Sequence, residues 1–285
     1  MTPDMHTIHI RELAVKAGAR TLLRLDELTI MAGERVAIVG HNGAGKSTLL
    51  RVIGGLLAPT EGEVSVLGRN LQQSVSDPTL RVWRSQVGQV MQGLHMVARL
   101  SARENVLIGA LGRLSGWRSW SRLYPAALVA EADEALALVG LQDRCDTRTD
   151  RLSGGERQKL SIARLYLQRP RLILADEPTA NLDPAAAADA CRWLGSVARG
   201  ATQITVVHQP ALLPLLADRV IGLRDGALVF DLPTNDVDPA RLDALYESGA
   251  LGNSPNLDAL SPFSSSHPQA TTRRPSVCTA ACQPG

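Results

Sequence analysis

A glycine-rich loop between an apolar run and a helical pattern constrains this chain more than any other feature. Residues 36–39 read VAIV, a β-branched run typical of a buried parallel strand. The loop that follows has the spacing GxxxxGKS of a P-loop, formed by Gly40, His41, Asn42, Gly43, Ala44, Gly45, Lys46, Ser47 and Thr48. Its glycines let consecutive backbone N–H groups curl around a phosphate, and the next helix adds a partial positive charge. A simple glycine-rich turn is the alternative, which the preceding strand and following helix disfavour. The sequence predicts a nucleoside triphosphate site.

Two side chains of this loop have a predicted chemistry. Lys46 can neutralise charge on the β- and γ-phosphates, and the Ser47 hydroxyl can ligate Mg²⁺. The Mg²⁺ site would need a carboxylate near Ser47 to complete it.

An apolar run that ends in carboxylates can supply it. Residues 172–177 read LILADE, which predicts a buried strand with Asp176 at its end. Asp176 could hold the Mg²⁺ water shell facing Ser47, and Glu177 could polarise a water in line with the γ-phosphate. A charged strand end that merely meets solvent is the other interpretation, and this run alone leaves the two equally open.

Further motifs follow in a fixed order. Gln92 follows a predicted strand at 87–91, LSGGE at 152–156 precedes a helical pattern, ANLD occupies 180–183, and His208 follows a strand at 204–207. With these motifs the chain resembles the nucleotide-binding subunit of an ATP-binding cassette (ABC) transporter, over roughly residues 8–246. They correspond to that family's Q-loop, signature, D-loop and switch histidine.

The resemblance implies a fold and a domain organisation. The expected fold is an α/β P-loop NTPase with a RecA-like core, an antiparallel β subdomain and an inserted α-helical lobe. The ATP-binding domain would span 6–247, with the lobe at about 93–168. Residues 248–285 are rich in Ser, Pro and Thr, and this composition predicts a disordered tail.

The resemblance also implies a mechanism for ATP and Mg²⁺. Two subunits would pair head to tail, so that ATP at the P-loop of one is covered by the signature of the other. Glu177 would orient the water, His208 would contact the γ-phosphate, and Gln92 would link Mg²⁺ to the lobe. The implied metal ligands are Ser47, Gln92 and Asp176, and the further nucleotide-binding residues are Ser153, Gly154, Gly155 and Asp183.

The transported substrate is suggested by finer resemblance. Residues 104–113 with 117–119, residues 217–231 and the pair His208-Gln209 are similar to phosphonate-import ATPases, although Trp117 and Trp120 could equally be lobe packing. That similarity implies an importer of phosphonates or related phosphorus anions. Its partners would be a second ATP-binding subunit in a homodimer, two transmembrane permease subunits and a periplasmic-type binding protein. The ATPase would sit at the cytoplasmic face of the inner membrane. An ATPase subunit for export or lipoprotein release, and a soluble non-transport ABC ATPase, remain alternatives.

Net charge and composition argue against several classes of protein. The formal net charge is only +2, so no global basic field points to nucleic acid. No apolar run is long enough to span a bilayer, no signal-peptide core is present at the start, and the four cysteines form no disulfide framework. We expect a reduced, cytoplasmic protein.

One departure from the family concerns the base. Residues 13–20 read LAVKAGAR, without the aromatic residue on which the family usually stacks adenine. Adenine could rest on the aliphatic stems of Val15 or Lys16, or on no tight platform, so the sequence predicts little selectivity for the base.

Overall fold

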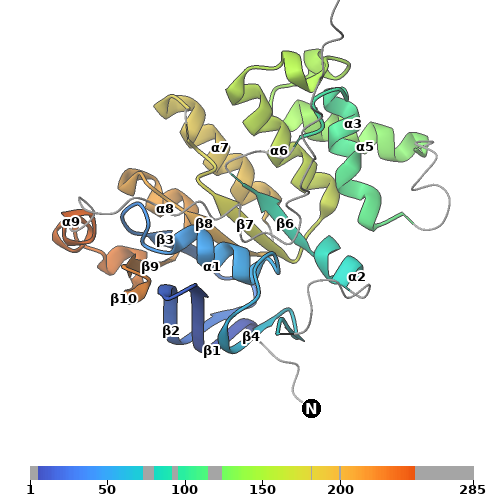
Figure 1. Cartoon of the computed structure of the whole chain (residues 1–285). Helices are drawn as coiled ribbons and strands as arrows, with labels where there is room; N and C mark the ends of the chain where they lie inside the picture. Colours follow the sequence, from blue (N-terminus) through green and yellow to red (C-terminus); the bar gives the residue numbers. More distant parts are fainter. Residues whose placement is uncertain are drawn as a thin grey trace, which may run out of the picture.

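One mixed sheet runs through the part of the chain that the computed structural model describes, residues 6–72, 80–91, 96–114, 124–180, 182–198 and 200–247. Within these residues ten strands pair in the order β5-β4-β1-β2-β10-β9-β3-β8-β7-β6 (Figure 1). Its antiparallel half consists of β1 (His6–Ala17), β2 (Arg20–Met31), β4 (Glu61–Val66) and β5 (Arg69–Asn70). The parallel half consists of β3 (Arg35–Val39), β6 (Val87–Val90), β7 (Leu172–Asp176), β8 (Thr202–Val206) and β9 (Arg219–Arg224).

Apolar patterning explains both halves. In β1 and β2 the alternating residues that pair across the strands, Ile8 with Ile30 and Ile10 with Leu28, are all buried. Every residue of β7 and β8 is buried, because both faces of the parallel half are covered by helices. The strands predicted at both places are confirmed.

The last two strands occupy the middle of the sheet. Strand β10 (Ala227–Pro233) pairs antiparallel with β9 and in parallel with β2, so this hairpin joins the two halves. Its turn has φ of 52° at Asp225 and 80° at Gly226, as a type I′ turn requires. The predicted hairpin is confirmed.

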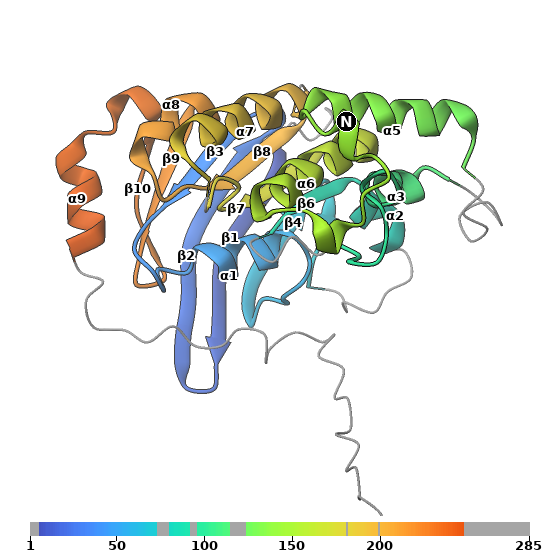
Figure 2. The same ribbon diagram turned by 90° about the horizontal axis from the view of Figure 1, so that it is seen from above.

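Helices cover the sheet in two layers. α1 (Lys46–Ile53) buries Leu49, Leu50 and Ile53 in a core shared by both halves of the sheet. On the other face of the parallel strands, a second core contains residues of α7 (Pro184–Val197), α8 (Leu213–Leu216) and α9 (Pro239–Glu247). Figure 2 shows α7 and α8 lying along β3 and β8. Short elements complete this part: α2 (Leu80–Ser85), η4 (Pro210–Leu212) and η5 (Thr234–Asp236).

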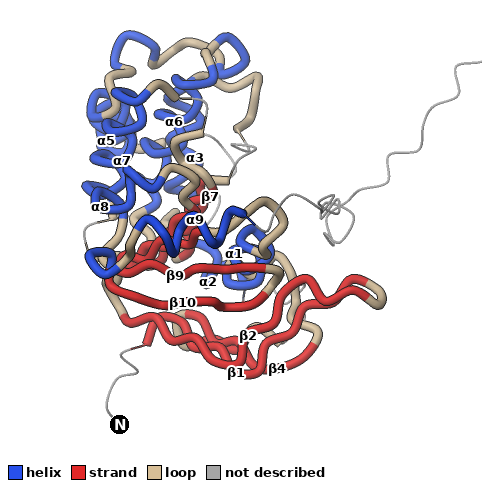
Figure 3. The backbone as a smooth tube through the Cα atoms, turned by 90° about the vertical axis from the view of Figure 1, so that its left-hand side faces the viewer, coloured by secondary structure: helices blue, strands red, loops and turns tan. Residues whose placement is uncertain are grey.

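A third core belongs to a helical lobe, built by α3 (Ala102–Ile108), α5 (Ala126–Leu138) and α6 (Gly154–Gln168). Figures 1 and 3 place these helices at the end of the molecule away from β1, β2 and β4. α3 begins with the predicted capping box between Ser101 and Glu104. Three 3₁₀ turns connect the helices: η1 (Gly109–Gly112), η2 (Gln142–Arg144) and η3 (Thr149–Arg151).

Several predicted features fall outside the described residues. These are Gln92, Trp117, Arg118, Ser119, Trp120, Asn181 and the tail 248–285. The domain boundaries also stay a prediction. Among the helices that are described, none has the length and apolar character needed to cross a membrane.

Candidate nucleotide site

Three parallel strands carry the predicted site residues to one edge of the sheet. Val206 of β8 lies opposite Ile38 of β3 on one side and opposite Asp176 of β7 on the other. Parallel strands end at the same edge, where α/β sheets bind their ligands. The loop after β3, the carboxylates at the end of β7 and His208 after β8 therefore lie together.

The loop after β3 is held from behind by the hairpin β9–β10. A side chain at Gly40, where φ is 152°, would place its Cβ 2.2 Å from the carbonyl oxygen of Leu223, so only glycine fits. The Gly226 N–H donates to the Ala44 carbonyl over 3.1 Å. His41 Nε2 also lies 3.3 Å from an Asp225 carboxylate oxygen. The conformation of the loop is thus fixed by contacts with a hairpin that lies far away in sequence.

Lys46 is folded back over the loop. Its Nζ donates to the carbonyl oxygens of Gly40 at 2.7 Å and His41 at 2.9 Å, and the side chain is 6% exposed. An ammonium has three donors, so one N–H remains for a ligand. Burial lowers the pKa of Lys46, and the charges of Glu177 and Asp176 oppose that shift. A phosphate bound here would contact an ammonium group that is nearly buried and has one donor left.

Asp176 is a buried carboxylate that is only partly satisfied. Burial raises its pKa, and a hydrogen bond from the Ser47 hydroxyl opposes the shift. Its Oδ1 is buried and has no hydrogen-bond partner. A hydroxyl beside a carboxylate with a free oxygen is the donor set that Mg²⁺ takes in nucleotide sites, so these two residues fit the metal.

Glu177 and His208 are in direct side-chain contact at the same edge. His208 Nε2 is 2.7 Å from Glu177 Oε1, and both side chains are partly exposed. This contact holds the pKa of Glu177 below its usual range, so the carboxylate is charged. Glu177 has φ of 53°, a left-handed backbone conformation that is uncommon for a residue other than glycine.

The signature and D-loop residues lie elsewhere, at the starts of α6 and α7. Ser153 caps α6 by accepting from the Glu156 N–H, and Asp183 caps α7 by accepting from Ala186 N–H over 3.0 Å. Gly154 and Gly155 form the first turn of α6, in the lobe. The structure therefore does not gather Ser153, Gly154, Gly155 and Asp183 around the P-loop of their own chain.

The base-binding expectation changes in part. Val15 is 1% exposed and belongs to the core under β1, so its stem is not available to adenine. Lys16 is exposed and forms an ion pair with Glu61. A residue that the sequence reasoning missed lies behind the loop instead: the Tyr246 hydroxyl of α9 is buried beside the backbone of Gly40. The only sequence signal for this helix is its Asp-Pro start at 238–239.

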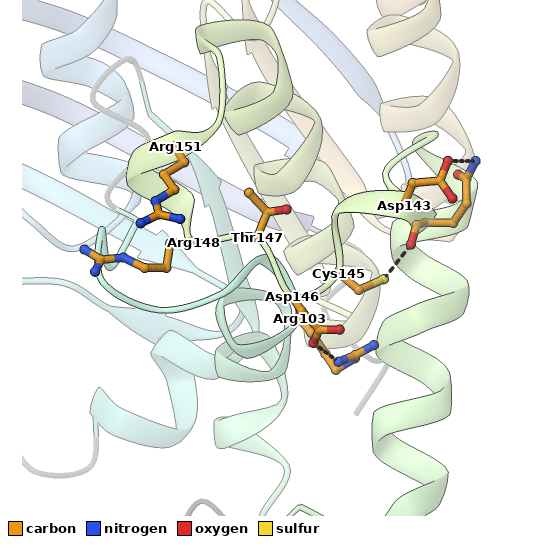
Figure 4. A pocket seen from close by; sticks show the side chains of 8 residues that line it. Arg103, Asp143, Cys145, Asp146, Thr147, Arg148 and Arg151 are labelled. Carbon is orange, nitrogen blue, oxygen red and sulfur yellow. Dashed lines mark hydrogen bonds and ion pairs between the residues drawn. The ribbon is translucent and has the colours of Figure 1, made fainter.

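A polar pocket of about 550 Å³ lies in the lobe, apart from this edge (Figure 4). Arg103 forms ion pairs there with Asp133 and Asp146. The Cys145 thiol donates to the Gln142 carbonyl over 3.1 Å. These internal pairs satisfy much of the charge of the pocket.

The comparisons of family, sequence and structure with known proteins agree with one another. The ABC transporter family profile matches residues 23–180. The phosphonates import ATP-binding protein PhnC 2 of Synechococcus sp. (strain JA-2-3B'a(2-13)) is 42% identical over 77% of this chain and 82% of its own length. A PhnC 1 protein of Rhodopseudomonas palustris (strain HaA2) is 40% identical over 81% of this chain and 82% of its own length. Among solved structures, a dimeric ATP-binding cassette in a post-hydrolysis state with ADP and phosphate superposes with a TM-score of 0.71. It is 29% identical, and the match covers 80% of this chain and 98% of that one.

Proposed function

This chain belongs to the ABC transporter family, and from that premise we propose that it is the ATP-hydrolysing subunit of an importer for phosphonates or related phosphorus anions. The observation that carries the catalytic part is the pair Glu177–His208, set beside a P-loop at the edge of one parallel sheet. The substrate rests on relatives that are about 40% identical and are named as phosphonate importers.

The groups at this site have separate roles in ATP binding and hydrolysis. Backbone N–H groups of the loop and the free donor of Lys46 bind the β- and γ-phosphates of ATP. Glu177, which its contact with His208 keeps charged, orients the attacking water and acts as its general base. His208 holds the Glu177 carboxylate in place. It would contact the γ-phosphate once ATP is bound.

Mg²⁺ would be held by Ser47 and Asp176, with Gln92 as a third candidate from outside the described residues. When bound, the ion neutralises charge that develops on the transferred phosphoryl group. The buried free oxygen of Asp176 supports this assignment.

The signature residues act in a partner's site in this proposal. Ser153, Gly154 and Gly155 start a helix in the lobe. Ser153 and Gly154 are exposed and Gly155 is partly exposed, so a second subunit could present its P-loop to them. Two copies that pair head to tail would complete two ATP sites, with Asp183 near the junction. The lobe would meet two permease subunits at the cytoplasmic face of the membrane, and a periplasmic-type binding protein would select the anion.

Hydrolysis is tested by two substitutions. Glu177→Gln should bind ATP and hydrolyse it at least a hundredfold more slowly, accumulating a nucleotide-bound dimer. Lys46→Ala should lose ATP affinity, because the loop has no second basic residue that reaches the γ-phosphate. Steady-state phosphate release, nucleotide binding and gel filtration measure these effects. Turnover of Glu177→Gln close to wild type would remove Glu177 from its role.

The substrate is tested by gene deletion in the source organism. Loss of this gene should abolish growth on a phosphonate as sole phosphorus source and leave growth on inorganic phosphate intact. A plasmid copy should restore growth, and a Glu177→Gln copy should not. Normal growth of the deletion strain on every phosphonate and phosphite its parent uses would contradict the import of these anions. It would leave the export, lipoprotein-release and non-transport alternatives.

A further inference from the structure

A buried side chain joins the signature helix to the catalytic strand end. Gln158 lies on α6, one helical turn after the signature glycines, and is 8% exposed. Its Nε2 donates to the carbonyl oxygen of Pro178 over 2.6 Å. Pro178 directly follows Glu177, so this hydrogen bond attaches α6 to the peptide next to the catalytic carboxylate.

Two further contacts join α6 to the chain that follows β7. A Cβ placed at Gly155 would be 3.3 Å from Leu182 Cδ2, so the Leu182 side chain packs on the first turn of α6. Lys159 Nζ lies 5.3 Å from the ring centre of Trp193 on α7. Figure 1 shows α6 and α7 side by side at this place. The first two turns of α6 are therefore in direct contact with Pro178 and Leu182.

The backbone of Glu177 can respond to such a contact. Its left-handed φ of 53° is a conformation that a non-glycine residue keeps only when neighbouring groups impose it. The Ala180 N–H donates to the Glu177 carbonyl over 3.0 Å, which closes a turn around Pro178. A pull on the Pro178 carbonyl therefore acts on the orientation of the Glu177 side chain.

We propose that Gln158 is a positioning residue that couples the two nucleotide sites of a dimer through a single protomer. In the proposed function, on which this inference rests, α6 of one protomer covers the ATP of its partner, while Glu177 of that same protomer acts on its own ATP. The Gln158–Pro178 hydrogen bond connects these two ends. When α6 docks on the nucleotide of the partner, this hydrogen bond orients Glu177 of the same protomer to hydrolyse the ATP that this protomer binds.

Mixed dimers test this coupling because they separate the two ends. One protomer carries Glu177→Gln, so that only the site with the intact Glu177 turns over. Gln158→Met, which removes the donor and keeps the length, is placed either in the protomer with the intact glutamate or in the other one. Two affinity tags isolate the mixed species, and phosphate release and ATP dissociation constants are measured for each.

Gln158→Met in the protomer that keeps Glu177 should lower turnover about tenfold or more, because small errors in the position of a catalytic group have effects of up to ~100-fold. Placement in the other protomer should leave turnover within about twofold, and ATP affinity should be unchanged in both. Equal losses in the two placements, or none in either, would overturn the proposal. If Gln158→Met does not fold, Gln158→Asn serves the same purpose, since its amide is one methylene too short to reach Pro178.

The matched control is Gln168, at the other end of the same helix. Its Nε2 donates to the carbonyls of Ser85 and Val87 over 3.2 and 2.9 Å, a glutamine-to-backbone contact of the same kind. Gln168→Met should leave turnover in both placements close to the reference dimer. A loss equal to that of Gln158→Met would show general loosening of α6 and overturn the coupling. A wild-type dimer that does not hydrolyse ATP would instead overturn the proposed function, and the coupling with it.

Discussion

Asp176, the proposed metal ligand, carries a destabilising feature in the ligand-free protein. Its carboxylate is 7% exposed and has one oxygen without a partner. Burial of an unpaired charge is unfavourable, and the raised pKa of this group expresses that penalty. A ligand that supplies positive charge at this place would remove the penalty. The ligand-free protein is therefore less stable than its core alone would make it.

We expect Asp176→Asn to stabilise the ligand-free protein while it loses Mg²⁺-dependent ATP binding. The folded pKa lies above the unfolded one, so the Asp176 contribution is favourable at pH below ~4 and is lost as pH rises through the folded pKa. Asparagine does not ionise, so its advantage should be absent near pH 4 and complete at neutral pH. A gain of about 0.5–2 kcal/mol, at ~2–4 °C per kcal/mol, should appear in melting temperatures measured across this range without nucleotide.

Asp183→Asn is the matched control, because asparagine caps a helix as well as aspartate does. It should shift the melting temperature little, at acid or neutral pH. A lower melting temperature for Asp176→Asn at neutral pH would show that the carboxylate is compensated in the folded protein.

At the scale of elements, the hairpin β9–β10 is the support of the P-loop. Gly226→Ala should destabilise the protein and weaken ATP binding together. Its φ is 80°, and a Cβ would lie 2.7 Å from the Leu22 carbonyl oxygen, so the turn would have to move. The turn also donates to Ala44, so the loop would follow. We expect a loss of about 2–4 kcal/mol in urea unfolding, from the left-handed backbone and the clash combined.

Gly68 provides the control for backbone strain alone. Its φ is 76°, and a Cβ there would meet nothing within 4 Å. Gly68→Ala should therefore lower stability by only ~1–2 kcal/mol and leave the ATP dissociation constant unchanged. Equal effects of the two variants on ATP binding would mean that the hairpin does not support the loop.

Local patterns in the sequence predict most of these elements and few of the contacts between them. The P-loop, the strand that ends at Asp176 and the turn at Asp225-Gly226 are specified by neighbouring residues, so they could be predicted. The position of β10 beside β2 depends on pairing across nearly the whole domain. The contacts of Gln158 with Pro178 and of Tyr246 with the Gly40 backbone are likewise long-range, and no spacing in the sequence reports them.

At the scale of the whole molecule, the described fold accounts for residues up to 247. Residues 248–285 contain few large apolar side chains, and their composition predicts that they cannot offset the entropy of ordering. Truncation after Glu247 should leave the ATPase rate and the melting temperature nearly unchanged. A shift of the melting temperature by more than ~3 °C, or about 1 kcal/mol at this size, would mean that the tail packs on the domain.

The central place of the hairpin β9–β10 also has a consequence for synthesis on the ribosome. Strand β3 is made early, but its neighbour β9 begins roughly 180 residues later, which at ~5–20 residues per second is a delay of about 10–40 s. Until then β2 and β3 are two open edges of unfinished half-sheets, the kind of surface on which nascent chains aggregate. A transcript truncated before β9 would thus yield a fragment that aggregates. The nascent chain should depend on a chaperone that binds it until β9 and β10 have been synthesised.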